Sequence, residues 1–333
     1  MTIGEIINTY GRKQSPYMRS LVNHLPMGQL ALFKLTNDLD KVKEYSEKYA
    51  QDSKINPVKS EYPKINLLEE TLGKRELYES ALEIIQEEIR EENVDNIIEE
   101  ILNKYILGMS AGIFHTLIRL AYGVEGYKMD KDLIYEVSRA LAYYVTGYRE
   151  GELFTKEING ENIIDEMRQI ADDSHIKEII ASNKTLGQRL KALYNDKFYM
   201  DEGFIIGGDE DEKIKSLLKL LIPAYDDSGN IVVLHCITGL HALIVLKQYF
   251  YDFHKALNVF TTTVISHLMT VDSLKYPDKI QDISELSWDC IRIKGARSSD
   301  VHAIKLTYSA YELDKIYNIP QLKNSALKRI KRN

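Results

Sequence analysis

The sequence predicts an all-α fold, built as a single large multi-helix globular domain around a buried central site. Apolar residues recur at intervals of three and four, rather than in alternation, through most of the 333 residues. The seven prolines are widely scattered, so few of them interrupt a helical pattern. With 44% hydrophobic residues, the chain is long enough to bury one large core.

Helical stripes of apolar residues follow one another along the chain, separated by polar segments. We expect helices over 77–89, 94–120, 214–221, 231–246, 259–269 and 301–311. We expect loops over 52–62, 151–162, 200–212 and 226–230, which are rich in charged residues, proline or glycine. The loop near 205 would separate candidate lobes 1–200 and 212–333, but histidines occur in both, so a single domain over 1–333 is preferred.

Charge and cysteine content exclude several classes of protein. The net charge of −7 and the pI near 5.7 argue against a nucleic-acid or anionic-membrane partner. The basic residues over 328–332 are expected to form a solvated helix end. Two cysteines, Cys236 and Cys290, cannot make a disulfide framework, and with no signal-peptide pattern they indicate a cytoplasmic protein. The apolar run over 231–246 is shorter than the roughly 20 residues of a membrane span.

Five of the eight histidines lie among apolar residues on four separate predicted helical segments. They are His24, His115, His235, His241 and His302. Any one of them alone is more often a core residue with a backbone partner than a ligand. As a set they are explained equally well by one convergent metal site, because imidazole is the commonest neutral metal ligand.

Spacing relates some of these histidines to one another. Pro26 fits the first turn of a helix, which places His24 at the mouth of that helix. The rings of His235 and His241 are six residues apart and should diverge by about 120°. His302 and Lys305 share a face, and the pKa of a lysine in apolar surroundings falls, which leaves a usable neutral amine.

Arg119 lies one turn after His115 on the same predicted helix face. If buried, its guanidinium needs an anionic partner. We expect it to bind an anionic or carbonyl group of a substrate, with Tyr122 lining the same pocket, or else to form a structural salt bridge with a carboxylate such as Glu125.

Standard cofactor and catalytic motifs are missing. The sequence contains no GxGxxG after a strand, no GxxxxGK[ST], no GxSxG and no HExxH. It therefore predicts no standard dinucleotide, nucleotide, esterase or zincin site.

Four segments resemble the questin oxidase-like family in order and separation. They are Asn23-His24-Leu25-Pro26-Met27, the run from Phe114-His115-Thr116 to Gly123-Val124-Glu125, His235-Cys236-Ile237-Thr238 and His302-Ala303-Ile304-Lys305. The resemblance implies an α-helical enzyme that oxidises polyketide-derived aromatic rings. Such enzymes are either NADPH-dependent Baeyer–Villiger-type oxygenases or non-haem iron ring-cleaving dioxygenases, whose iron is held by histidines and a carboxylated lysine.

Carried over residue by residue, the resemblance implies that four histidines and one lysine match the family's metal ligands. They are His24, His115, His235, His302 and Lys305. Many relatives have a second histidine where this chain has Arg119, so His241 is the candidate for the missing imidazole.

Three hypotheses follow. The first is a non-haem iron oxygenase that acts on an aromatic or quinone-like small molecule with O2, with Arg119, Tyr122 and Glu125 as candidate substrate-binding residues. The second is an NADPH-dependent Baeyer–Villiger-type oxidase without metal, which the missing dinucleotide motif disfavours. The third is a non-catalytic helical protein that binds a small ligand in the same pocket.

Overall fold

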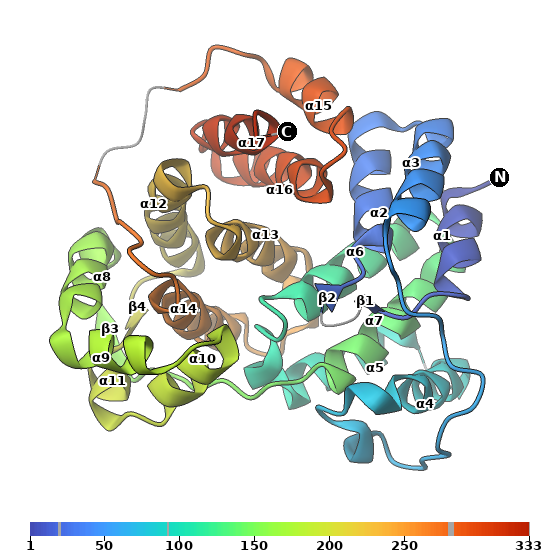
Figure 1. Ribbon diagram of the computed structural model, residues 1–333, viewed down its shortest axis with the longest axis horizontal. Helices are drawn as coiled ribbons and strands as arrows, with labels where there is room; N and C mark the ends of the chain where they lie inside the picture. The colour runs from blue at the N-terminus through green and yellow to red at the C-terminus, as the bar shows by residue number, and fades with distance from the viewer. Residues whose placement is uncertain (19–20, 92, 279–282, 333) are drawn as a thin grey trace.

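The computed structural model describes residues 1–18, 21–91, 93–278 and 283–332, and helix dominates them (Figure 1). The all-α prediction is confirmed. The α-helices of these residues are α1 (Ile3–Gly11), α2 (Leu25–Thr36), α3 (Leu39–Asp52), α4 (Tyr78–Glu91), α5 (Val94–Lys104), α6 (His115–Met129), α7 (Ile134–Thr146), α8 (Ile163–Asp172), α9 (Ser174–Ser182), α10 (Leu186–Tyr194), α11 (Lys197–Glu202), α12 (Glu210–Ser228), α13 (Ile231–Val245), α14 (Phe253–Met269), α15 (Trp288–Ala296), α16 (Val301–Tyr317) and α17 (Leu322–Ile330).

Short strands and 3-10 turns complete the described secondary structure. β1 (Tyr17–Met18) pairs antiparallel with β2 (Leu21–Val22), and β3 (Lys156–Ile158) pairs parallel with β4 (Phe204–Ile206). The 3-10 turns are η1 (Leu68–Thr71), η2 (Arg75–Leu77), η3 (Ile106–Gly108), η4 (Lys131–Leu133), η5 (Gly160–Asn162) and η6 (Lys247–Tyr249). β3 and β4 fall in two segments that the sequence predicted to be loops.

Four helices, α2, α6, α13 and α16, form a ring in which each packs against the next. Figure 1 shows α6 and α13 near the centre of the molecule, with α2 and α16 beside them. The other helices cover this ring from outside: α3 and α15 pack on α2, α7 on α6, α12 on α13 and α17 on α16. The ring helices are apolar on nearly all sides, as buried helices are. Nearly every residue of α13 is buried, so the predicted core helix over 231–246 is confirmed.

The prediction of one continuous helix over 94–120 is wrong, because the helix is interrupted in its middle. α5 ends at Lys104, a 3-10 turn follows, and α6 begins only at His115. Gly112, Ile113 and Phe114 all have positive φ, at 62°, 58° and 62°. Helix cannot pass through three consecutive left-handed residues. Periodicity did not reveal the break because apolar residues within it, such as Ile106, Met109 and Phe114, are buried and continue the apolar stripe.

The C-terminal basic residues are not simply solvated, as we had expected. Lys328 donates to the backbone carbonyls of Asp226 and Asp227, and Arg332 donates to those of Ser228 and Gly229. These carbonyls belong to the last turn of α12, whose unpaired acceptors and partial negative charge favour cations. The loop predicted over 226–230 is shorter than expected, because α12 extends to Ser228.

Buried apolar side chains from both sides of residue 205 form one contiguous core. Among the described residues, no helix combines the length and the apolar character that crossing a bilayer requires.

Candidate metal centre

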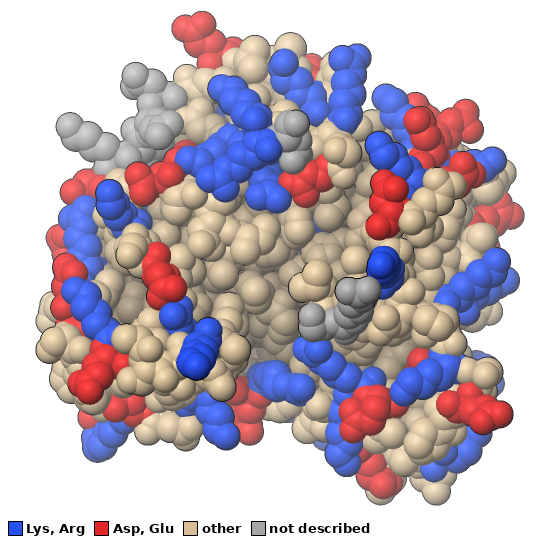
Figure 2. All heavy atoms as spheres, in the orientation of Figure 1, with Lys and Arg blue, Asp and Glu red and all other residues tan. Residues whose placement is uncertain are grey.

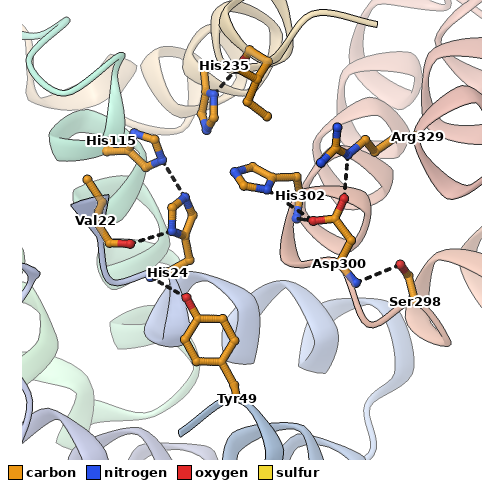
Figure 3. Close-up of polar contacts among 10 residues, drawn as sticks. Val22, His24, Tyr49, His115, His235, Ser298, Asp300, His302 and Arg329 are labelled. Atoms are coloured by element: carbon orange, nitrogen blue, oxygen red, sulfur yellow. Dashed lines mark hydrogen bonds and ion pairs between the residues drawn. The ribbon is translucent and has the colours of Figure 1, made fainter. Parts of the chain in front are cut away.

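Four histidines meet inside the helical ring, one from each of its helices (Figure 3). One nitrogen from each of His24, His115, His235 and His302 can be chosen so that all four atoms lie within 4.8 Å of one another. His115 and His235 are buried, and His24 and His302 are partly exposed. The structure thus brings together four of the five histidines singled out in the sequence, from segments up to 278 residues apart.

Each of these histidines lies at or near the N-terminal end of its helix. His24 precedes the first residue of α2, with Pro26 in the first turn as predicted. His115 is the first residue of α6, and His302 is the second residue of α16. His235 is the fifth residue of α13. Four helix N-termini therefore converge on the group.

The Nδ1 atoms of the four rings all face hydrogen-bond acceptors. His24 Nδ1 lies 2.7 Å from the carbonyl oxygen of Val22, and His235 Nδ1 lies 2.7 Å from that of Ile231. His115 Nδ1 contacts the carbonyl oxygen of Gly112, and His302 Nδ1 lies 3.2 Å from Asp300 Oδ1. Because these oxygens accept, Nδ1 carries the proton, and each Nε2 presents an unshared electron pair. This is the ring orientation found in metal-bound histidines.

The Nε2 atoms of His24, His115 and His235 have no adequate partner among the described residues. His24 Nε2 and His115 Nε2 face each other at 2.7 Å, and His235 Nε2 is buried with no hydrogen-bond partner. Two unshared pairs at this distance repel unless both nitrogens bind the same cation. A buried polar atom without a partner is also unfavourable by about 1–3 kcal/mol. The group can hold a metal ion, which would satisfy several of these atoms at once.

Burial keeps the imidazoles neutral, as metal ligands must be. It lowers the pKa of His24, His115 and His235 well below the ordinary value, and the nearby charge of Lys305 lowers all three further. Burial also lowers the pKa of His302, although Asp300 acts in the opposite direction. A proton shared between His24 and His115 is therefore a poor substitute for a metal.

Lys305 lies next to the four histidines and is completely buried, and its Nζ has no hydrogen-bond partner. Burial lowers its pKa from 10.5 to about 7. The side chain is thus a neutral amine in a substantial fraction of molecules at neutral pH, in agreement with the sequence-based expectation.

The backbone around the group is strained where it positions His115. Ile113 and Phe114 adopt the left-handed conformation, which disfavours side chains with a Cβ, and Ile113 is β-branched. The carbonyl of Gly112, at the start of this turn, accepts from His115 Nδ1. Such strain, about 1–3 kcal/mol per residue, persists mainly where the surrounding packing holds it at functional sites.

Gly239 allows α13 to approach this turn. A Cβ at Gly239 would lie 2.9 Å from Cγ of the fully buried Phe114. Because Gly239 is one turn after His235, the close contact fixes the distance between α13 and α6. The rings of His235 and His115 consequently have centroids only 4.3 Å apart.

Two residues that the sequence analysis missed hold the partly exposed histidines. Asp300 caps α16, accepts from the backbone and ring of His302, and accepts from Arg329 Nε at 2.6 Å (Figure 3). Its position two residues before His302, at a predicted helix start, was a usable signal. The hydroxyl of Tyr49 accepts from the backbone N–H of His24 at 3.3 Å. No local sequence feature links Tyr49 to His24, because α3 and α2 come into contact only in the folded structure.

His241 lies outside the group, as its predicted divergence from His235 requires. Its ring packs edge-on against Tyr308, with centroids 5.4 Å apart. Tyr308 donates a hydrogen bond to Glu125, which also lies 3.4 Å from Lys34. The chain therefore offers the cluster four imidazoles, and the role of reserve ligand for His241 is not supported by its position.

Arg119 is held by a carboxylate, but the prediction that this carboxylate belongs to Glu125 was wrong. Its Nε lies 2.8 Å from Glu136 Oε1, and Arg139 occupies the other oxygen of Glu136. Arg119 also borders a cavity of about 10 Å³, enough for about one water molecule. Tyr122 is buried against Tyr308, with ring centroids 5.9 Å apart. Substrate binding by Arg119, Tyr122 and Glu125 stays a prediction.

The remaining histidines, His175, His254 and His267, have surface or packing positions. His175 forms a surface pair with Asp196, and His254 is exposed. His267 is buried, with Nδ1 2.7 Å from the carbonyl of Thr263 and its ring against Phe114. It is a buried histidine with a packing role, outside the group of four.

The comparison with known families agrees with this geometry. The model of the questin oxidase-like family matches residues 21–310, which include all four histidines and Lys305. The chain belongs to the questin oxidase-like family. Among curated proteins, none matches the chain. The family is named for an oxidase, which suggests an enzyme, and the resemblance seen in the four sequence segments is confirmed.

Proposed function

We propose that the protein is a non-haem iron oxygenase that acts on an aromatic or quinone-like small molecule. The observation that carries the proposal is the pair of Nε2 atoms of His24 and His115, which face each other at 2.7 Å while both Nδ1 atoms lie against backbone carbonyl oxygens. A metal ion bound by both Nε2 atoms would remove the repulsion between their unshared electron pairs. Membership of a family named for an oxidase supports oxidation as the reaction class.

The four imidazoles would hold the metal, and their supports would fix its position. The Val22, Gly112 and Ile231 carbonyls and the Asp300 carboxylate set the direction of each ring. Hydrogen bonds of this kind also raise the basicity of the ligating nitrogen. Iron, when bound, would supply the electrons that activate O2.

Lys305 would complete the site as a carbamate. A divalent ion held by four neutral imidazoles is an uncompensated charge in a buried site, which is unfavourable. Addition of carbon dioxide to the neutral Lys305 amine forms a nitrogen–carbon bond, releases one proton and leaves an anion. The pKa of about 7 makes this amine available at neutral pH, and a bound metal would in turn stabilise the anion.

The test is metal content after purification without a histidine tag. We expect about one iron ion per chain, because a site with four protein donors typically binds a single metal ion. His235→Ala should lose most of the metal. His267→Ala removes an equally buried histidine outside the group and should retain it. Metal analysis by mass spectrometry, with oxygen uptake in the presence of hydroxylated aromatic compounds, measures both effects.

Two results would favour the alternatives. Oxygen uptake that requires NADPH and survives complete removal of metal would favour a Baeyer–Villiger-type oxidase. Ligand binding without any oxygen uptake, in protein loaded with iron, would favour a non-catalytic binding protein.

A further inference from the structure

His302 differs from the other three histidines of the group in what holds its ring. The Nδ1 atoms of His24, His115 and His235 face backbone carbonyl oxygens, whose positions are set by the fold of the chain itself. His302 Nδ1 instead lies 3.2 Å from the carboxylate of Asp300, a side chain that can rotate about its own bonds. The His302 side chain is also 19% exposed, so water can compete for the proton on Nδ1. The direction of this ring therefore depends on what fixes Asp300.

Asp300 lies between His302 and Arg329, and both of its carboxylate oxygens are engaged (Figure 3). Oδ1 accepts from the backbone N–H of His302 at 2.9 Å and faces the ring, and Oδ2 accepts from Arg329 Nε at 2.6 Å. A hydrogen bond between a guanidinium and a carboxylate is stronger than one between neutral groups, and the side chains of this pair are only 18% and 14% exposed. The plane of the carboxylate thus cannot turn without breaking one of these bonds.

Arg329 belongs to α17, which is anchored independently of this contact. Ser325, Lys328 and Arg332 all donate hydrogen bonds to the C-terminal end of α12. Figure 1 shows α17 beside α16, and the two helices pack against each other. The segment that matches the questin oxidase-like family ends at residue 310, so α17 lies outside it. The helix therefore presents a fixed guanidinium to the start of α16 from a part of the chain that the family's histidine pattern does not include.

Arg329 is one of several cations on and after α17, and Figure 2 shows lysine and arginine side chains gathered over this part of the molecule. A positive charge near the site opposes the binding of a metal cation. If Arg329 acted through its charge alone, its removal would tighten metal binding. If it acts by holding Asp300, its removal would weaken metal binding, because the ring of His302 would lose its direction. The two roles therefore differ in the sign of their effect.

We propose that Arg329 is a positioning residue of the candidate metal centre, which holds the Asp300 carboxylate so that the Nε2 atom of His302 points to the metal. This inference rests on the proposed function, since it assigns Arg329 a role at the same metal site. The guanidinium makes no contact with the metal in this role and acts through one carboxylate. α17 is then a part of the centre as well as a cover over α16.

The first test needs no metal. In protein kept metal-free with EDTA, at about pH 8 where a histidine is neutral, nitrogen-15 NMR of the imidazoles reports which ring nitrogen carries the proton. The signals of His302 are assigned by their loss in His302→Gln. We expect His302 of the wild type to carry its proton on Nδ1. Arg329→Gln should produce a mixture of the two tautomers, because the carboxylate no longer fixes Nδ1, and should leave the other three rings of the group unchanged.

The second test is the affinity for cobalt(II), whose visible absorption reports the number and geometry of its ligands. We expect Arg329→Gln to weaken cobalt binding roughly 10- to 100-fold, as the loss of an outer hydrogen-bonding partner typically does, and to change the visible spectrum. Arg329→Lys should retain most of the affinity. The contact uses Nε of Arg329, and a lysine ammonium lies one atom further along the side chain, so it can reach Oδ2 of Asp300.

Two controls at the same end of the chain separate this role from helix docking and from charge. Arg332→Gln removes hydrogen bonds between α17 and α12 and leaves Arg329 in place, so it should lower stability without weakening cobalt binding. Lys331→Gln removes an exposed positive charge, and should leave cobalt binding unchanged or slightly tighter. Thermal unfolding of the metal-free variants measures stability and verifies that each is folded.

A double-mutant cycle shows whether Arg329 acts through Asp300. Asp300→Asn keeps a side chain that caps α16 but removes the charge that the guanidinium contacts. In the Asp300→Asn background, Arg329→Gln should have little further effect on the affinity for cobalt, because residues that act through one contact are not additive.

Unchanged or tighter cobalt binding by Arg329→Gln overturns the proposal, and so does an unchanged tautomer of His302 in that variant. Equal weakening by Arg332→Gln, or additive effects of Arg329→Gln and Asp300→Asn, would assign the effect to helix docking and overturn it as well. Failure of the proposed function looks different: the tautomer of His302 then depends on Arg329 in a protein that binds neither iron nor cobalt. Metal bound by the four histidines with no effect of Arg329→Gln would remove only the role of Arg329.

Discussion

Two groups of buried polar side chains lie one turn apart on α6, and they differ in how their charges are satisfied. Around Arg119, the carboxylate of Glu136 accepts from two arginines, and Arg139 Nη2 also donates to Asn8 at 2.5 Å. Around His115, imidazole nitrogens face one another and Lys305 has no partner. Both arginines of the first group contact a carboxylate, although Arg119 Nη1 has no hydrogen-bond partner among the described residues, whereas Lys305 in the second group contacts no carboxylate.

The pKa values of the two buried cations express the same difference. Burial alone would lower the pKa of Arg119, but Glu136 raises it above its ordinary value. Burial lowers the pKa of Lys305 to about 7 because no anion opposes it strongly enough. A buried charge with a counter-charge indicates a structural role, whereas a buried charge without one indicates a binding site.

Breaking the paired group should produce the largest effect on stability. Glu136→Gln leaves Arg119 and Arg139 buried without a counter-charge, and we expect it to lower the free energy of unfolding by about 3–5 kcal/mol. Urea denaturation measures this. Asp201→Asn, which breaks the exposed pair with Lys197, should change stability by less than about 1 kcal/mol. Equal effects of the two variants would contradict the comparison.

Replacing the unpaired cation should have the opposite sign. In metal-free protein, Lys305→Met should raise the free energy of unfolding by about 1–4 kcal/mol, as replacement of buried ions by apolar side chains often does. With iron bound, the same change should instead weaken metal binding. Lys215→Met, at an exposed position on α12, is the control and should alter neither property.

The effect of Lys305→Met should depend on pH in a defined window. Below the folded pKa of about 7, Lys305 is protonated in both states and destabilises the folded state fully. Between pH 7 and 10.5, only the unfolded state holds the proton, so the wild type gains stability as the pH rises. The advantage of the Lys305→Met variant should therefore be largest below the folded pKa and small near the unfolded one. A pH-independent advantage would contradict the unpaired amine.

A smaller effect should follow from widening the contact between α13 and α6. Gly239→Ala places a methyl group against Phe114, and we expect a loss of about 1–3 kcal/mol, typical of overpacked cores. The metal content should fall with it, because His235 moves away from His115. Gly187→Ala in α10 meets nothing within 4 Å and should be neutral or slightly stabilising. Calorimetric unfolding and metal analysis of both variants separate the packing effect from helix propensity.

The sequence predicted α2, α13 and α16 of the ring and the histidines that all four ring helices carry, because both depend on local pattern. The mostly apolar run of α13 indicated a buried helix, and Pro26 marked the start of α2. The break before His115 could not be predicted in this way, since Ile113 and Phe114 are ordinary apolar residues and only tertiary packing holds them at positive φ.

The partners of the polar residues were the least predictable part. Arg119 needed a carboxylate, but the choice between Glu125 on its own helix and Glu136 on α7 depends on how two helices pack. Tyr49 and Tyr45 reach α2 through the contact of α3 with that helix, and no spacing in the sequence indicates this. Periodicity identifies which face of a helix is buried, but not what lies opposite.

The convergence of four helix N-termini on the histidines also determines the electric field there. Each helix carries about half a positive elementary charge at its N-terminal end. A metal cation would enter this point against the field of α2, α6, α13 and α16, so its affinity must come from the directed imidazole nitrogens. Any anion that completes its coordination would be favoured by the same field. The bundle therefore sets a preference for negatively charged ligands before any side chain contacts them.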